Sequence, residues 1–325
     1  PGTPQLRQAI AARVTAQTGT PTTPDNVMVT AGGQAALFAA HIACCDPGDT
    51  ALFIDPYYAT YPGTIRGASA HPRAVPALPE RGFQPRAADV AAAAPGAASL
   101  LINSPNNPTG VVYAPETMAA LADVCGAHDL WLISDEVYDT QIWAGQHTSA
   151  WSLPGVQDRT LVVNSMSKSF AMTGSRIGWI IGPEAVVEHL INLSTHTTYG
   201  VPGFLQDAAH FALGLGPAFE AEIAAPFERR RAIAYRLLQD TNVVRAVPCD
   251  GAMYVMLDIR ATGLSGEAFA NRLLDREKIA VMPGESFGSA AAGHLRVALT
   301  VADPVFEDAF QRLLRFAEEA ANLAA

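Results

Sequence analysis

The feature of this chain that most constrains its fold is a regular alternation of short apolar runs and longer segments with helical patterning. The runs are nearly continuously apolar, which is typical of strands covered on both faces of a parallel sheet. Strands are expected at residues 27–30, 50–54, 99–102, 130–134, 160–163 and 177–181, and helices at 4–18, 34–45, 115–128 and 183–194. The sequence therefore predicts an α/β fold, with a mostly parallel sheet flanked by helices.

A second unit is expected after the long helical stretch at residues 218–239. Its expected elements are strands at 253–259, 279–282 and 294–298 and helices at 266–277 and 304–321. A chain of 325 residues is long enough for two domains of ordinary size. We therefore expect a large domain over residues 1–220 and a smaller α+β C-terminal domain over residues 221–325.

Composition and charge argue against several classes of protein. The formal net charge of −10 is unfavourable for a nucleic-acid surface, which needs clustered Lys and Arg. No apolar run approaches the length of a membrane span and no signal peptide opens the chain, so we expect no membrane partner. The four cysteines show no Cys-x-x-Cys spacing and no nearby histidine pair. No metal site or disulfide is therefore indicated, and a reduced, cytoplasmic chain is expected.

Lysine is almost absent, since Lys168 and Lys278 are the only two among 21 basic residues. Lys168 closely follows an apolar run, and Arg176 lies eight residues further on. Arginine stays protonated in proteins, whereas the amine of a lysine can lose its proton. A lysine retained at this place indicates an amine that forms an imine with an aldehyde, as in enzymes that use pyridoxal 5′-phosphate. An exposed loop lysine is the alternative.

Further candidates lie just after apolar runs, where open parallel sheets bind their ligands. Asp135 follows the run at 130–134 and would suit the ring nitrogen of the cofactor. Gly32-Gly33-Gln34-Ala35 joins a strand to a helix and offers backbone N–H groups to a phosphate, although a plain helix start looks the same. Tyr58 is a candidate for the ring that covers the cofactor, with a core aromatic residue as the alternative.

Four short motifs occur in order along the chain: SPNNPTG at residues 104–110, SDEVY at 134–138, SMSK at 165–168 and RIGW at 176–179. Together they resemble the signatures of the class I and II aminotransferases, which are fold-type-I enzymes that depend on pyridoxal phosphate. The similarity runs from residues 2–7 to residues 294–299, over essentially the whole chain. The joint match is specific, although each motif alone is modest. The resemblance implies the fold of the type I pyridoxal-phosphate-dependent transferases.

The resemblance also implies roles around the cofactor ring. Lys168 would be the catalytic residue, which carries the Schiff base and then moves the proton between the substrate carbon and the cofactor. Asp135 would pair with the pyridine nitrogen, and Tyr58 would stack on the ring. Tyr138 and Asn107 would hydrogen-bond its 3-oxygen.

Two further groups of residues take their roles from the same resemblance. The α-carboxylate of the substrate would be bound by Asn107 and by Arg296, which would act as a two-pronged guanidinium clamp. For Arg296, a surface salt bridge is the alternative. The phosphate would be held by Gly33, Gln34, Ser165 and Arg176, and Ala35 is a further candidate for cofactor binding.

Transamination is the expected reaction, because these residues would hold the substrate carboxylate and present the Cα–H bond to Lys168. A β-eliminating lyase on the same scaffold is the runner-up, although such lyases often carry a histidine where this chain has Val137-Tyr138. A less favoured alternative is an aminotransferase-like sensor domain of a transcription regulator. Residues 32–37, 164–174 and 206–209 most resemble arginine:pyruvate-type aminotransferases, with the broader aspartate aminotransferase group as the fallback.

The resemblance thus implies transfer of an amino group from an L-amino acid, with arginine as the candidate donor, to a 2-oxo acid such as pyruvate. Because the family forms dimers with active sites at the interface, we expect a homodimer. Family members usually carry several tens of residues before the motif at residues 2–7, including a tyrosine that reaches the phosphate of the neighbouring subunit. We expect that this segment is omitted from the sequence, and we assign no residue to its roles.

Overall fold

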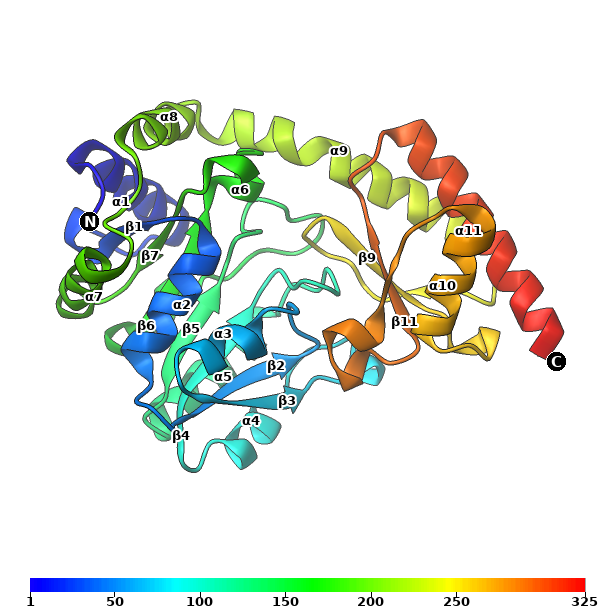
Figure 1. Cartoon of the computed structure of the whole chain (residues 1–325), viewed down its shortest axis with the longest axis horizontal. Coiled ribbons are helices and arrows are strands. Elements are labelled where there is room, and N and C mark those ends of the chain that lie inside the picture. Colours follow the sequence, from blue (N-terminus) through cyan, green and yellow to red (C-terminus); the bar gives the residue numbers. More distant parts are fainter. Residues whose placement is uncertain (325) are drawn as a thin grey trace.

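The computed structural model describes residues 1–324, which form a large layered body and a smaller one beside it (Figure 1). The main sheet has seven strands in the order β1-β7-β6-β5-β4-β2-β3. Each apolar run named above is one of these strands, to within two residues. The strands are β1 (Val27–Thr30), β2 (Thr50–Asp55), β3 (His71–Pro76), β4 (Ala97–Asn103), β5 (Trp131–Asp135), β6 (Thr160–Ser165) and β7 (Gly178–Ile181).

Most neighbouring strands of this sheet are parallel, so the predicted mostly parallel α/β fold is confirmed. The exception is β7, which is antiparallel to both β1 and β6. The connection from β6 to β7 holds only the short helix α6 (Met166–Ser169) and a 3₁₀ turn at Thr173–Ser175. It lacks the crossover helix that usually returns the chain for a parallel strand.

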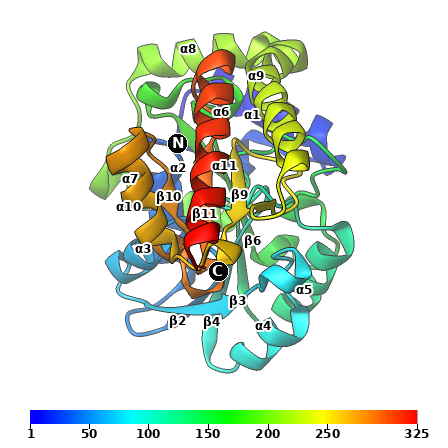
Figure 2. The ribbon, with the colours of Figure 1, turned by 90° about the vertical axis from the view of Figure 1, so that its right-hand side faces the viewer.

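Helices cover both faces of the sheet (Figures 1 and 2). The helices of one layer are α1 (Pro4–Thr18), α4 (Ala87–Ala93), α5 (Pro115–Ala127) and α8 (Gly203–Gly214). Those of the other layer are α2 (Gly33–Cys44), α3 (Tyr61–Gly67) and α7 (Glu184–Thr197).

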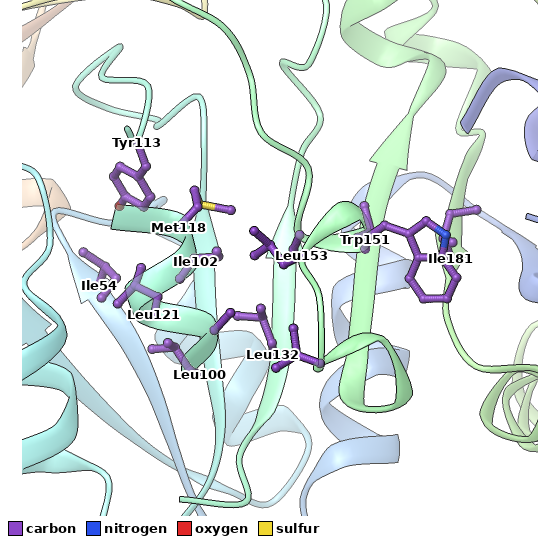
Figure 3. Packing of buried hydrophobic residues seen from close by; sticks show 14 of the residues in the cluster. Ile54, Leu100, Ile102, Tyr113, Met118, Leu121, Leu132, Trp151, Leu153 and Ile181 are labelled. Atoms are coloured by element: carbon purple, nitrogen blue, oxygen red, sulfur yellow. The ribbon is translucent and has the colours of Figure 1, made fainter. Parts of the chain in front are cut away.

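Successive residues of the central strands enter opposite layers of the core. In β4, Leu100 and Ile102 belong to the layer that contains Met118 and Leu121 of α5 (Figure 3). Leu101, between them, belongs to the layer of α2 and α3. Because both faces are buried, the middle residues of such a strand are mostly apolar, which explains the nearly continuous apolar runs in the sequence.

The ends of the first helix follow from local sequence. Thr3 is the N-cap of α1, and its hydroxyl oxygen accepts a hydrogen bond from the N–H of Leu6. Pro4 takes the first helical position, where its missing N–H costs nothing. Gly19 ends the helix with φ +70°, a left-handed conformation that favours glycine.

The smaller body is the expected α+β unit. Its antiparallel sheet has the order β10-β11-β9-β8 and packs with α9 (Gly216–Leu237), α10 (Gly266–Glu277) and α11 (Asp303–Ala324) around a core of its own. The strands are β8 (Arg245–Ala246), β9 (Tyr254–Asp258), β10 (Met282–Pro283) and β11 (His294–Ala298).

The pattern of apolar residues gave the wrong bounds for one strand and did not predict several other elements. The strand expected at 279–282 is reduced to β10, in which Pro283 has no N–H to extend the ladder. The edge strand β3 was not predicted, because its residues are mostly exposed and include Pro72 and Pro76. The helix α8 and the short strand β8 were not predicted either.

Helix α9 runs from the large body to the smaller one along one side of the molecule (Figure 1). The domain boundary expected between residues 220 and 221 falls inside this helix and stays a prediction. Within residues 1–324, none of the helices has the length and apolar character needed to cross a membrane.

Candidate active site

A cavity of about 170 Å³ lies at the carboxyl ends of β4, β5 and β6, next to the N-terminus of α2. This is the edge at which parallel sheets bind their ligands. The structure brings most of the predicted site residues together here. Those that line the cavity are Gly33, Gln34, Tyr58, Asn107, Asp135, Tyr138, Ser165, Lys168 and Arg176.

One end of this cavity has the features of an anion site. The N-terminus of α2 carries backbone N–H groups without intrahelical partners, and its N-cap, Gly32, has no side chain to accept from them. The guanidinium of Arg176 lies so close that a Cβ on Gly32 would collide with it. Ser165 and Ser167 place hydroxyl groups in the same cavity. Backbone N–H groups, hydroxyls and a guanidinium together suit a phosphate.

Asp135 is the acid of the cavity and is buried at the end of β5. Its Oδ2 accepts a hydrogen bond of 2.7 Å from the hydroxyl of Tyr61, and its Oδ1 accepts one of 3.3 Å from the N–H of Val137. Burial raises the pKa of Asp135 to about 6, although both hydrogen bonds act in the opposite direction. A carboxyl group with this pKa can share a proton with a basic ring nitrogen near neutral pH.

Lys168 stands on α6, and its Nζ is 5.8 Å from the centroid of the Tyr138 ring. Burial lowers the pKa of Lys168, and the positive charges of Arg176 and Arg296 lower it further, against the attraction of Asp135. A lysine with a lowered pKa is more often neutral, and only the neutral amine can attack a carbonyl or accept a proton.

Arg296 comes from β11 of the smaller body. Its Nη1 donates a hydrogen bond of 2.9 Å to Oδ1 of Asn107. The ring centroids of Tyr254 and Phe287 lie 4.5 and 4.6 Å from its Cζ. Its Nε is buried and has no hydrogen-bond partner within residues 1–324. A guanidinium that is held by packing and keeps an unpaired N–H donor is well placed to bind a carboxylate.

Two of the predicted residues do not line the cavity itself. Arg296 is connected to it through the hydrogen bond to Asn107. Ala35 instead lines an open surface hollow beside α2, together with Phe38 and Thr64. The roles assigned to these two residues and to the lining residues stay predictions.

Several lining residues were missed: Leu37, Tyr61, Asn103, Val137, Ser167 and Tyr254. Asn103 had a signal, because it is a polar residue at the end of an apolar run; its Oδ1 accepts the N–H of Asn107 at 2.8 Å. No sequence signal pointed to Tyr254, because it belongs to the smaller body and lies far in the sequence from the other lining residues. Its hydroxyl lies 3.0 Å from that of Tyr138.

The residues of the cavity fit pyridoxal phosphate. A cradle for an anion, a buried carboxyl group and a lysine amine match its phosphate, ring nitrogen and aldehyde. The seven-stranded sheet with its smaller α+β partner is the fold of the type I transferases, and the fold and cavity together define an enzyme of that class.

Comparison with known proteins narrows the class, and the chain belongs to the aminotransferases of class I and II, whose sequence model matches residues 1–313. The arginine–pyruvate transaminase AruH of Pseudomonas aeruginosa is 44% identical over 316 residues, which cover 97% of this chain and 80% of that protein. The aspartate/prephenate aminotransferase of Thermus thermophilus is 36% identical over 319 residues, covering 97% and 81%.

Among solved structures, the aromatic aminotransferase from Pyrococcus horikoshii OT3 has a TM-score of 0.93 and 32% identity, over 98% of this chain and 86% of that one. The aspartate aminotransferase from Thermus thermophilus with maleate has a TM-score of 0.90 and 35% identity, over 97% and 82%. The predicted family and fold type are confirmed, and members of this family use pyridoxal phosphate.

Proposed function

We propose that this aminotransferase uses pyridoxal phosphate to move the amino group of an L-amino acid to a 2-oxo acid, with arginine as the donor and pyruvate as the acceptor. The observation that carries the proposal is the placement of Lys168 and Asp135 in one cavity with an anion cradle at its end. The bound cofactor would supply an aldehyde for the amino group and a ring that draws electrons from the Cα–H bond.

The N-terminus of α2 and its neighbours hold the phosphate in this proposal. The backbone N–H groups of residues 33–35 donate to it, and Ser165 adds a hydroxyl. Arg176 supplies the countercharge and is itself oriented by a hydrogen bond of 2.9 Å from its Nη1 to the carbonyl of Thr173. Tyr58, half-exposed at the cavity, covers one face of the ring.

Two acid–base groups then divide the work. Asp135 holds the proton of the pyridine nitrogen, and Tyr61 fixes its carboxylate by donating to Oδ2. Lys168 moves a proton at Nζ, for which its lowered pKa is an advantage because the neutral amine is the base. Tyr138 and Asn107, which also line the cavity, would offer a hydroxyl and an amide to the 3-oxygen of the ring.

Arg296 and Asn107 bind the substrate carboxylate. Arg296 places a guanidinium next to the cavity through its hydrogen bond to Asn107, and its unpartnered Nε leaves a donor free for a carboxylate oxygen. A carboxylate bound by both residues would keep the substrate in one fixed position in the cavity that Lys168 lines, which favours reaction over random encounter.

The choice of arginine as donor is supported by the 44% identity to an arginine–pyruvate transaminase. Among the described residues that line the cavity, Asp135 is the only carboxylate. A donor guanidinium would therefore find hydroxyl and amide groups in this set rather than a second acid. A donor panel separates the possibilities: arginine inert while aspartate or an aromatic amino acid reacts would contradict this part of the proposal.

We also propose a homodimer. Apolar side chains are strongly exposed on and next to α8, where Tyr199, Phe204 and Phe211 are 89%, 73% and 71% exposed. A second copy is the simplest cover for such a surface. Light scattering on a sizing column tests this, and a monomeric mass with full activity would contradict it.

Four free, buried cysteines support a cytoplasmic location.

The decisive experiment is the visible absorbance of the purified protein with pyridoxal phosphate, before and after single amino acids are added, with Lys168→Ala alongside. We expect a band that needs Lys168 and is converted by the true donor, while the oxo acid product accumulates. Release of ammonia together with pyruvate would identify a lyase instead. A protein without any such band would contradict the cofactor assignment.

A further inference from the structure

A buried aspartate joins the end of β2 to the smaller body. Asp55, the last residue of β2, is 3% exposed. Its Oδ2 accepts hydrogen bonds from the N–H and the hydroxyl of Ser289, at 3.0 and 3.1 Å, and from the N–H of Ala290 at 3.3 Å. Beside them, the N–H of Tyr57 donates to the carbonyl of Phe287 at 2.9 Å. These bonds connect segments more than 200 residues apart in the sequence.

The contact is shaped for a carboxylate. Gly288 has φ +119°, in the region that favours glycine, and a Cβ there would collide with the carboxylate of Asp55. The groups that face the two oxygens from Ser289 and Ala290 are all donors. A carboxylate accepts from all of them, whereas an amide in its place would turn its NH₂ group toward at least one donor, the N–H of Ala290.

This contact lies between two sides of the active-site cavity. Phe287 directly precedes the residues that Asp55 contacts, and the centroid of its ring lies 4.6 Å from Cζ of Arg296. Tyr58, three residues after Asp55, lines the cavity. The bonds that Asp55 accepts thus hold the backbone two and three residues after Phe287, whose ring packs against the guanidinium.

We infer that Asp55 is a positioning residue for substrate binding: it holds residues 287–290 against the turn at 55–58, and Phe287 in turn holds the guanidinium of Arg296 in the orientation that receives the substrate carboxylate. This inference rests on the proposed role of Arg296. The amino acid and the oxo acid both carry that carboxylate. Loss of the contact therefore raises the KM of both substrates and changes kcat less.

The test compares Asp55→Asn with the wild-type holoenzyme. We expect the KM of donor and acceptor, and the dissociation constant of propionate measured by calorimetry, to rise together by about 10- to 100-fold, the scale of a misplaced binding group. The matched control is Asp49→Asn, at the opposite end of β2, whose carboxylate accepts the N–H of Asp46. It should leave all three constants unchanged.

Two further variants separate the possible failures. Arg296→Gln must weaken propionate binding if the proposed function is right; unchanged binding would overturn that role and the inference with it. If Arg296→Gln weakens binding while Asp55→Asn stays within about twofold of wild type, the inference alone is overturned. In a Phe287→Leu background, Asp55→Asn should add little, whereas full additivity would show that Asp55 does not act through Phe287.

If Asp55→Asn does not fold, Ser289→Ala takes its place. It removes one donor, the hydroxyl at 3.1 Å from Oδ2, and leaves the carboxylate and the backbone bonds of the contact. A smaller rise of both KM values, about 2- to 10-fold, is expected for the loss of one hydrogen bond. Unchanged KM values and unchanged propionate binding in this variant would contradict the inference.

Discussion

Removal of a single hydroxyl group, in Tyr61→Phe, should weaken the acid of the active site without disturbing its shape. Tyr61 and Asp135 are 2% and 5% exposed, and the hydroxyl donates to Oδ2 at 2.7 Å. A hydrogen bond to a charged group contributes about 1.5–3 kcal/mol. At 1.36 kcal/mol for each tenfold change, its loss favours the protonated carboxyl by about 10- to 100-fold.

The sign of the effect follows from the direction of the pKa. Burial already raises the pKa of Asp135 to about 6, and the bond from Tyr61 opposes that rise, so the variant has a higher pKa still. The carboxyl group then keeps more of the proton that it shares with the ring nitrogen. Because a protonated ring is the better electron acceptor, we expect kcat to fall by about 10- to 100-fold. KM should change little, since the Tyr61 hydroxyl donates to Asp135, whereas the pair proposed to bind the substrate carboxylate is Arg296 and Asn107.

The assay is single-turnover conversion of the bound cofactor by the donor, followed from pH 5 to 9. In Tyr61→Phe the acid limb of the rate profile should move to higher pH. The matched control is Tyr113→Phe, which removes the hydroxyl of another fully buried tyrosine that does not donate to Asp135. A Tyr61→Phe enzyme with the rate and pH profile of the control would refute the reasoning.

Three other changes test separate parts of the structure. Gly32→Ala should weaken cofactor affinity by at least about tenfold in a fluorescence titration, because its Cβ would displace the Arg176 guanidinium and the residue has φ +83°; unchanged affinity would exclude the phosphate cradle. Arg296→Lys should raise the KM of both substrates by about 10- to 100-fold, since an ammonium cannot bind a carboxylate with two parallel bonds; equal KM values would refute the clamp. His41, buried with neither ring nitrogen hydrogen-bonded within residues 1–324, has a pKa lowered by burial from 6.5 to about 4. The unfolded chain therefore binds the extra proton, and up to about 3 kcal/mol of stability is lost as the pH falls from 6.5 to 4. His41→Leu should remove that loss and add about 1–3 kcal/mol at pH 7 in urea unfolding; an unchanged pH dependence would contradict it.

The local sequence predicted most of the elements and the chemistry at the strand ends. Helix α10 and strand β11 have the bounds expected from patterning, because each presents a clear apolar period and a defined start. Asp135 and Lys168 could be named because they stand in short motifs close to the ends of buried strands, whereas Asn107 was named through the family resemblance of its motif. Burial on both faces makes such strands mostly apolar, so a charged or amide residue at the end of the run is easily recognised.

Other features required the tertiary structure. The antiparallel direction of β7 depends on how the chain returns after β6, and an edge strand such as β3 lacks the burial that marks a central one. The bond from Tyr61 to Asp135 and the contact of Asp55 with Ser289 join segments far apart in the sequence. Periodicity reports which side of an element is buried, whereas the partner of a side chain is decided only when the layers pack. The reactive side chains at the strand ends could therefore be predicted from the sequence, whereas the side chains that hold them in position could not.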